Sequence, residues 1–163
     1  MSLPADPRLV LSEPELDAAL ESLLMAETSL WMVADAALAS QEPKLGRGHW
    51  RCAFLLRRRP GLGVQALAQL VGVTKQSMSR TVKELTAAGL IELQPAEDGR
   101  RREARLTPSG LAFEAACGER MRASLARAYR TGGVEAATGA RRIWSALAGG
   151  RGAHPKHRSP DLD

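Results

Sequence analysis

Two short segments of helical periodicity, separated by a glycine, constrain this chain more than any other feature. The apolar residues of the first segment recur at i, i+3, i+4 and i+7, which puts them on one face of a helix: Val64, Leu67, Ala68 and Val71. Gly72 interrupts the pattern, as a glycine in a turn does. Thr74 can then cap a second helix, and the apolar residues of that helix recur at i, i+4 and i+7: Met78, Val82 and Leu85. The spacing predicts two helices that cross closely at a tight turn.

The opposite face of the second helix is polar and almost free of acid. It carries donors suited to phosphates and base edges: Lys75, Gln76, Ser79, Arg80 and Lys83. A helix that lies in a DNA major groove presents such a face, so the pair of helices predicts a helix-turn-helix. This stretch alone leaves one alternative open, an ordinary helical hairpin with a solvated basic face.

The whole chain has the size and composition of one mainly helical domain. It contains 163 residues, of which 44% are hydrophobic and only 4% aromatic, so we expect a core of Leu, Val and Ala. No run approaches the ~18 apolar residues of a membrane span, and the first residues lack the pattern of a secretory signal. We therefore expect a single domain over 1–163, located in the cytoplasm and not in a membrane.

The net charge of +5 is unevenly distributed along the chain. Residues 1–50 hold 3 basic and 8 acidic residues, whereas residues 51–105 hold 11 basic and 5 acidic ones. The positive charge is therefore densest around the predicted helix-turn-helix, which favours an acidic partner such as DNA.

A long helix is predicted before this region, over 13–41. Ser12 and Glu15 have the spacing of a capping box at its start, and a Gln-Glu-Pro sequence ends it. Its apolar side is wider than one partner helix requires, so we expect a homodimer. A plain core helix of a monomer is the alternative.

A shorter helix is expected over 49–59, with Trp50, Phe54 and Leu55 facing inward. This helix ends with three arginines at residues 57–59. Basic residues in a last turn suit the helix dipole, and they could equally well contact DNA phosphates. His49 stands alone at the start of this helix, and we expect it to be structural.

A β-hairpin with a basic tip is predicted directly after the second helix of the pair. Gly89 should end that helix, residues 90–94 alternate like a strand, and residues 95–99 supply a turn. The chain returns as a second strand over 100–106, which begins with Arg100 and Arg101. A hairpin in this position is called a wing, and its arginines are well placed to enter a minor groove.

A second long helical region is predicted over 108–148. Thr107 and Pro108 suit an N-cap and a first helical position, and Gly132-Gly133 should interrupt the helix. The final segment, 149–163, has almost no apolar content and predicts a disordered tail.

The chain offers little for catalysis. Cys52 and Cys117 do not form a zinc or disulfide pattern, and we expect both to be small buried residues. No glycine-rich phosphate loop, Gly-x-Ser-x-Gly motif or His/Glu zinc spacing is found. We expect neither an enzyme nor a bound cofactor or metal.

The sequence resembles the MarR family of winged-helix transcriptional regulators. The resemblance rests on residues 64–107, and above all on Asp98-Gly-Arg100 followed by Leu106-Thr107 and then Gly110. It implies a mainly α (α+β) fold, a winged helix-turn-helix region over 49–107, and long N- and C-terminal dimerisation helices. It also implies a dimeric, sequence-specific repressor or activator that binds a pseudo-palindromic operator in double-stranded DNA.

The resemblance also implies roles for particular residues. Those expected to meet the major groove are Lys75, Gln76, Ser77, Ser79, Arg80 and Lys83. Arg100 would enter the minor groove with Arg101 beside it, and Asp98 would brace the wing. Thr81 departs from the family, which more often has an aliphatic residue there, and this puts the packing of the recognition helix in doubt.

A small-molecule effector is a further implication of the resemblance. Its cleft would be lined by aromatic and sulfur-containing side chains, which serve equally well as core residues: Trp31, Trp50, Phe54 and Met121. Two alternatives to an effector-controlled regulator stay open. One is redox sensing through Cys52 or Cys117, and the other is a winged helix that binds proteins and not DNA.

Overall fold

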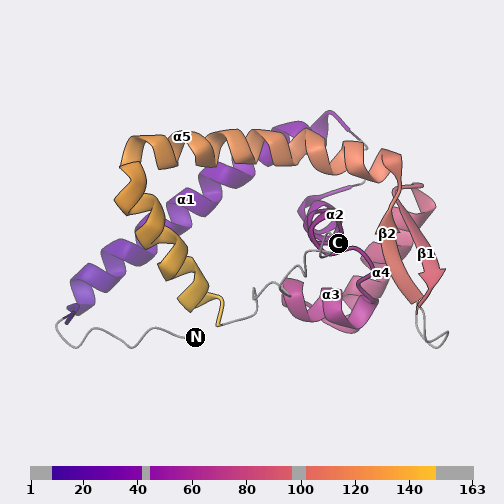
Figure 1. Ribbon diagram of the computed structural model, residues 1–163, viewed down its shortest axis with the longest axis horizontal. Helices are drawn as coiled ribbons and strands as arrows, with labels where there is room; N and C mark the ends of the chain where they lie inside the picture. Colours follow the sequence, from indigo (N-terminus) through magenta and orange to yellow (C-terminus); the bar gives the residue numbers. More distant parts are fainter. Residues whose placement is uncertain (1–8, 42–44, 97–101, 150–163) are drawn as a thin grey trace, which may run out of the picture. The chain divides into compact units, whose positions relative to one another are not determined.

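A computed structural model of the chain describes residues 9–41, 45–96 and 102–149 (Figure 1). The elements follow the order α1 (Glu13–Ala39), α2 (Arg47–Arg58), α3 (Val64–Val71), α4 (Lys75–Ala87), β1 (Ile91–Pro95), β2 (Arg102–Leu106) and α5 (Pro108–Leu147). Among the described residues, those within 11–125 form one compact unit, and residues 9–10 with 126–149 form another. That the two units act as the single domain predicted from the sequence stays a prediction.

The helix-turn-helix consists of α3 and α4, with the boundaries that the sequence predicts. Gly72 adopts φ +79°, and its N–H donates to the carbonyl oxygen of Ala68 at 2.9 Å. Thr74 caps α4, because its Oγ1 accepts the backbone N–H of Ser77 at 3.1 Å. The predicted apolar stripe of α4 is buried and packs toward α3 and α2: Met78, Val82 and Leu85.

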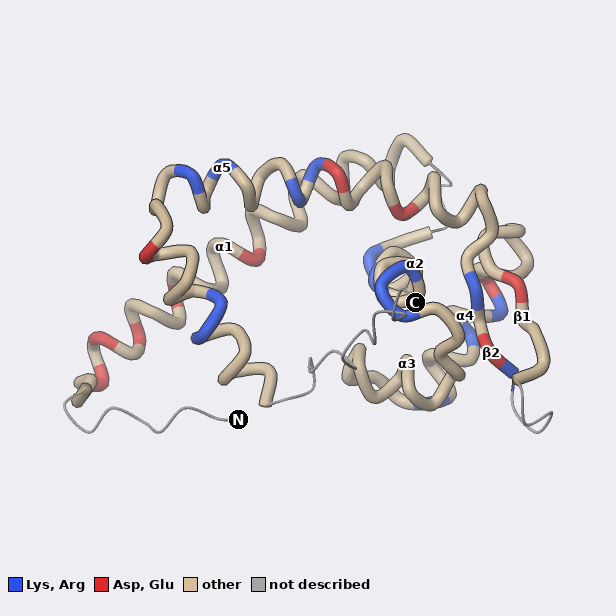
Figure 2. Tube along the Cα trace, viewed as in Figure 1, with Lys and Arg blue, Asp and Glu red and all other residues tan. Residues whose placement is uncertain are grey.

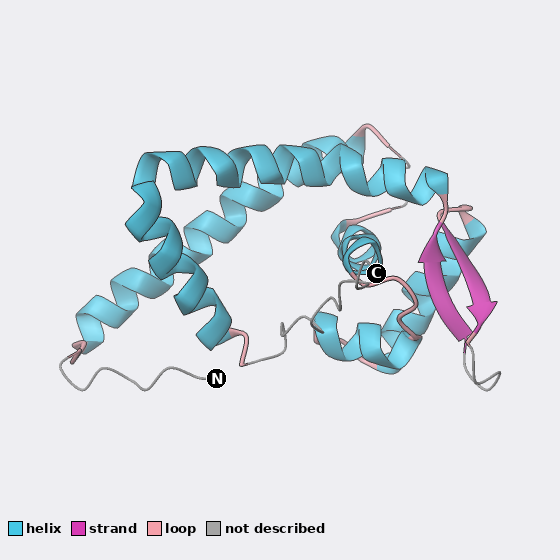
Figure 3. Cartoon of the chain, viewed as in Figure 1, coloured by secondary structure: helices cyan, strands magenta, loops and turns pink. Residues whose placement is uncertain are grey.

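The wing is an antiparallel pair, in which Ile91 faces Leu106 and Leu93 faces Ala104 (Figure 3). Ile91 and Ala104 point into the core. The sequence pattern did not show that β2 also meets the segment before α3, where Leu62 accepts the N–H of Ala104 at 3.1 Å. The wing is therefore tied to both ends of the helix-turn-helix.

The start of α5 is fastened to the turn that follows α4. Thr107 accepts the N–H of Gly110 on its Oγ1, as predicted for an N-cap, and the same hydroxyl donates to the carbonyl oxygen of Gly89 at 2.7 Å. Gly110 is buried so tightly that a Cβ there would lie 2.0 Å from the carbonyl oxygen of Leu90. A glycine is required at this position because backbone meets backbone.

The predicted inward face of α2 is partly wrong. Trp50 is buried as expected, but Phe54 and Leu55 are only half-buried, and the other buried residues are Cys52, Ala53 and Leu56. Small residues such as Cys52 and Ala53 give little signal in a hydrophobic pattern, yet they occupy the positions where neighbouring helices approach closely. The helix also begins two residues earlier than predicted, at Arg47.

The two long helices leave many apolar side chains uncovered. On α1 these are Leu16, Leu20, Leu24, Met25 and Met32, and in the C-terminal part of α5 they are Val134, Ile143, Trp144 and Leu147. Gly133 breaks the helical geometry of α5 with φ +79° and ψ 179°, where the sequence predicts an interruption.

No uninterrupted apolar run approaches a membrane span, but within the described residues α1 is long and apolar enough, by length and composition only, to cross a membrane. Its alanines and leucines raise the mean hydropathy over 18 residues to 1.2 even though acids recur between them. The 22% of that window that is buried includes the Trp31 end of the helix, which enters the core.

Candidate nucleic-acid interface

The exposed face of α4 collects the polar residues that the sequence predicts for the major groove. All six are exposed: Lys75, Gln76, Ser77, Ser79, Arg80 and Lys83. Gln76, Arg80 and Lys83 follow i, i+4, i+7 spacing opposite the buried stripe, so they project furthest from the core. Figure 2 shows Lys and Arg on α2, α4 and β2 and also along α5, whereas α1 carries acids and no base.

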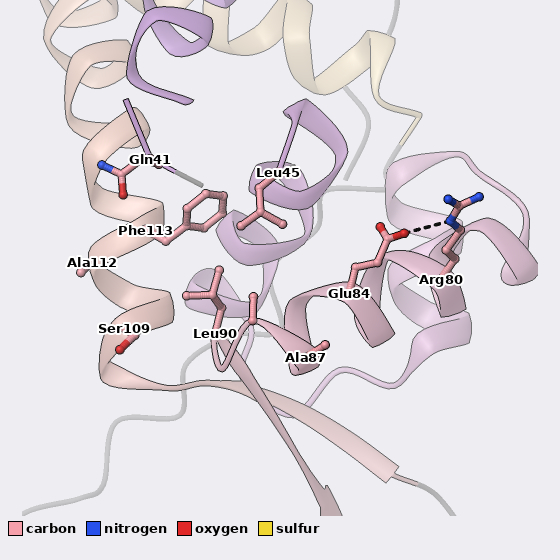
Figure 4. A pocket seen from close by; sticks show the side chains of 10 residues that line it. Gln41, Leu45, Arg80, Glu84, Ala87, Leu90, Ser109, Ala112 and Phe113 are labelled. Carbon is pink, nitrogen blue, oxygen red and sulfur yellow. Dashed lines mark hydrogen bonds and ion pairs between the residues drawn. The ribbon is translucent and has the colours of Figure 1, made fainter. Parts of the chain in front are cut away.

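Arg80 is held on this face by a hydrogen bond to an acid of the same helix. Its Nε donates to Oε1 of Glu84 at 2.9 Å (Figure 4). Oε2 of Glu84 lies 2.8 Å from Nε2 of His49 in α2. The pKa of the Glu84 carboxyl lies below its usual range, because hydrogen bonds first from Arg80 and then from His49 favour the ionised form. His49 is therefore structural, as predicted, but its link to the recognition helix has no signal in the sequence.

Thr81, the departure from the family pattern, is accommodated without a polar group being left unpaired. Its side chain is half-buried, and its hydroxyl donates to the carbonyl oxygen of Ser77 at 3.2 Å. A threonine hydroxyl inside a helix often donates a hydrogen bond to the backbone carbonyl oxygen four residues earlier. The packing of the recognition helix is therefore intact at this position.

The tip of the wing lies outside the described residues. Asp98, Arg100 and Arg101 all fall there, so their predicted roles in bracing the wing and in minor-groove contact stay predictions. In the described part of the hairpin, Arg102 and Arg105 are exposed on β2, and Arg105 lies 3.3 Å from a carboxylate oxygen of Glu103.

A buried ion-pair network, which sequence reasoning missed, joins α2 to α5. Glu114 is only 1% exposed, and its two carboxylate oxygens lie 2.7 Å from Nε of Arg57 and 3.1 Å from Nη1 of Arg122. Trp50 donates its indole N–H to the backbone oxygen of Glu114. Gly118 leaves the necessary room, since a Cβ there would lie 2.3 Å from the Glu114 carboxylate. An acid, a glycine and an arginine at i, i+4, i+8 are the sequence signal of this arrangement.

The residues predicted to line an effector cleft belong to the core or pack against it. Trp31 and Trp50 are buried and meet edge to face, with ring centroids 5.7 Å apart. Phe54 and Met121 are half-buried against the same core. These positions agree with the alternative that the four residues serve as core.

A pocket of about 1000 Å³ lies elsewhere, beside the C-terminal half of α4 (Figure 4). Side chains of α4 and α5, together with those of the segments that follow α1 and α4, form its wall, which is mostly apolar with a few polar groups. Its lining residues are Gln41, Leu45, Arg80, Glu84, Ala87, Ala88, Leu90, Ser109, Ala112 and Phe113. Arg80 and Glu84 therefore belong both to the recognition helix and to the pocket.

The described residues contain no cluster of three or more His, Cys, Asp or Glu side chains that could hold a metal ion. Both cysteines are buried, as predicted. Desolvation raises the pKa of the Cys52 thiol to about 12 and also raises that of Cys117. Neither thiol has the low pKa and the exposure of a redox sensor.

A capped recognition helix, a preceding helix that crosses it at a glycine turn, and an antiparallel hairpin define a winged helix-turn-helix. A family model described as MarR family matches residues 44–102. The HTH-type transcriptional regulator PetP of Rhodobacter capsulatus is 32% identical over 140 residues, which cover 85% of this chain and 83% of that protein. This chain therefore belongs to the MarR family of transcriptional regulators.

Solved structures agree with this assignment of the fold. A MarR family transcriptional regulator from Silicibacter pomeroyi superposes with a TM-score of 0.71 at 20% identity, covering 90% of this chain and 99% of that one. The Mycobacterium tuberculosis MarR family protein RV2887, in complex with salicylic acid, gives a TM-score of 0.55 at 26% identity, over 85% and 97% of the two chains.

Proposed function

We propose that this MarR family regulator is a cytoplasmic homodimer that binds a pseudo-palindromic operator in double-stranded DNA. The observation that carries the proposal is α4, whose apolar stripe is fully buried while its opposite face presents Gln76, Arg80 and Lys83 outward. These side chains are the usual donors to base edges and phosphates in a major groove. The wing, with Arg100 and Arg101 near its tip, would contact the adjacent minor groove.

Dimerisation would place two copies of α4 on one side of the duplex. A two-fold dimer binds half-sites whose centres lie about one helical turn, ~10 bp, apart. The uncovered leucines and methionines of α1 support this part of the proposal, because such a patch on a regulator marks a contact with another chain.

Control by a small molecule is the second part of the proposal. The pocket beside α4 has the size and mixed lining of a ligand site, and one of the similar structures is a complex with salicylic acid. A ligand in this pocket would touch the recognition helix itself. Occupancy would therefore be coupled to DNA binding through Arg80 and Glu84.

The test is selection of duplexes from a randomised pool by the purified full-length protein, followed by affinity measurements on the selected sequence. We expect an inverted repeat, and an affinity that falls steeply with salt, with a log-log slope near −0.9 per phosphate neutralised. Failure to enrich any sequence, together with an affinity that does not change with salt, would contradict DNA as the partner.

The alternative, a winged helix that binds only proteins, predicts the opposite result in this experiment. A protein-binding surface has no need for Lys75, Arg80 and Lys83 on one face of a helix that contains a single acid. The electrostatics of α4 therefore favour the nucleic-acid partner.

A further inference from the structure

Glu84 is the only acid of α4, and its presence on a helix that faces DNA requires an explanation. By charge alone a carboxylate repels the phosphates of a duplex and weakens binding. Its ion pair with Arg80 adds little to folding, since the Arg80 side chain is 82% and the Glu84 side chain 41% exposed. The order of the pair, arginine before glutamate, is also the less favourable one in a helix.

The geometry around Glu84 connects two helices. Oε1 accepts from Nε of Arg80, and Oε2 pairs with Nε2 of His49, which is only 15% exposed. His49 is itself held, because its Nδ1 accepts the backbone N–H of Gly46 at 3.0 Å. Since Nδ1 is an acceptor, the hydrogen of the neutral ring is on Nε2 and is donated to Glu84. Arg80 is thus tied through one carboxylate to the first turn of α2.

The two terminal nitrogens of the Arg80 guanidinium are suited to recognition of a base. The contact with Glu84 uses Nε, and in Figure 4 the dashed line from the carboxylate ends at this nitrogen and not at either terminal nitrogen of Arg80. A guanidinium recognises guanine with two N–H groups directed at O6 and N7. A long, exposed side chain loses rotamer freedom when it binds, and holding it beforehand lowers that cost.

We propose that Glu84, anchored by His49, is a positioning residue that orients Arg80 toward one base pair of the operator and so sets discrimination at that position. The inference rests on the proposed function, because it assumes that α4 enters a major groove. Glu84 would then contribute to sequence specificity, which explains its presence on α4 better than its charge or its small effect on stability does.

The first experiment compares Glu84→Gln with the parent on the selected operator and on duplexes changed at one base pair at a time. Arg80 and His49 each contact a different oxygen of the carboxylate, and the amide replaces one of these oxygens with an NH₂ donor, so in this geometry the network loses at least one hydrogen bond. We expect the preference at one position of each half-site to fall about tenfold, while affinity for unrelated DNA stays the same or rises.

The matched control is Glu92→Gln on β1. Glu92 is an exposed acid of the same unit, and it accepts a hydrogen bond from Gln94 and not from a basic residue of α4. This change removes the same charge, so it should alter the affinities for all duplexes by one common factor. If Glu84→Gln behaves like Glu92→Gln, with every preference unchanged, the proposal is wrong.

A double-mutant cycle tests whether Glu84 acts through Arg80. When Arg80→Ala has already removed the guanidinium, adding Glu84→Gln should cause no further loss of preference. An equal loss with and without Arg80 would show that Glu84 contacts or shapes the DNA independently, and would overturn the proposal.

His49→Gln extends the test to the anchor, and it should reduce the same preference in the same direction. Thermal unfolding of each variant verifies that the fold persists, since His49 also accepts from Gly46 at the start of α2. A folded His49→Gln protein with the parent's preferences would refute the anchoring role. If the parent selects no sequence at all, the proposed function fails and this inference fails with it.

Discussion

At the scale of single residues, burial determines which side chains are chemically active. Cys52 and Cys117 are fully buried, and the desolvation that raises the pKa of Cys52 to about 12 keeps its thiol protonated. The thiolate is the form that alkylating and oxidising agents attack. An interpretation of this protein as a thiol-based redox sensor therefore has no support at either cysteine.

We expect both cysteines to resist iodoacetamide in the native protein at pH 8. The raised pKa values mean that thiolate accumulates only as the pH approaches about 12 at Cys52, so intact mass should remain unchanged while a free-thiol peptide is fully alkylated. The same protein in urea should gain two alkyl groups. Alkylation of the folded protein at the rate of the peptide would show that one thiol is accessible.

At the scale of the elements, close contacts between backbones hold α5 against the helix-turn-helix. Thr107 joins the turn after α4 to the first turn of α5, and Gly110 lets α5 approach the carbonyl oxygen of Leu90. Glu114 then joins the same helix to α2 through Arg57. These contacts fix the first turns of α5 against α2 and the turn after α4.

Gly110→Ala should destabilise the protein by about 2 kcal/mol or more, because the new Cβ would overlap a backbone oxygen that no rotamer change can move. The matched control is Gly48→Ala in α2, where nothing lies within 4 Å of an added Cβ. That change should stabilise by up to about 1 kcal/mol, because alanine is the better helix former. Urea unfolding of both variants gives the comparison, and equal stabilities would contradict the close approach.

At the scale of the whole molecule, we expect a partner chain to cover the exposed apolar surface of α1. Its leucines and methionines remain uncovered, while its acids are spaced along the helix, a pattern that suits a protein interface better than lipid. A second copy of the chain would cover this surface symmetrically.

Light scattering at micromolar concentration should give twice the 17.5 kDa of one chain. Leu20→Asp should shift the equilibrium to monomer or aggregate, since it places a charge on the exposed apolar side of α1. Ser22→Asp is the control, because it adds the same charge about 200° away around the same helix. A monomeric parent, or equal effects of the two substitutions, would remove the claim of a dimer through α1.

Several elements follow from the sequence alone because their signals are local. The apolar spacing around Gly72, the cap at Thr74 and the Thr107-Pro108 start each depend on residues within a turn or two, and the structure agrees with all three. The break at Gly133 and the strand pairing of the wing are of the same kind.

Only the tertiary structure decided how these elements are joined. His49 meets Glu84 across 35 positions of the chain, and Glu114 lies in α5 while its partner Arg57 lies in α2. Periodicity reports which face of a helix is apolar but not which polar side chain it meets, since that depends on how two helices pack. For the same reason the pocket beside α4 draws on residues of three separate segments, which no sequence pattern brings together.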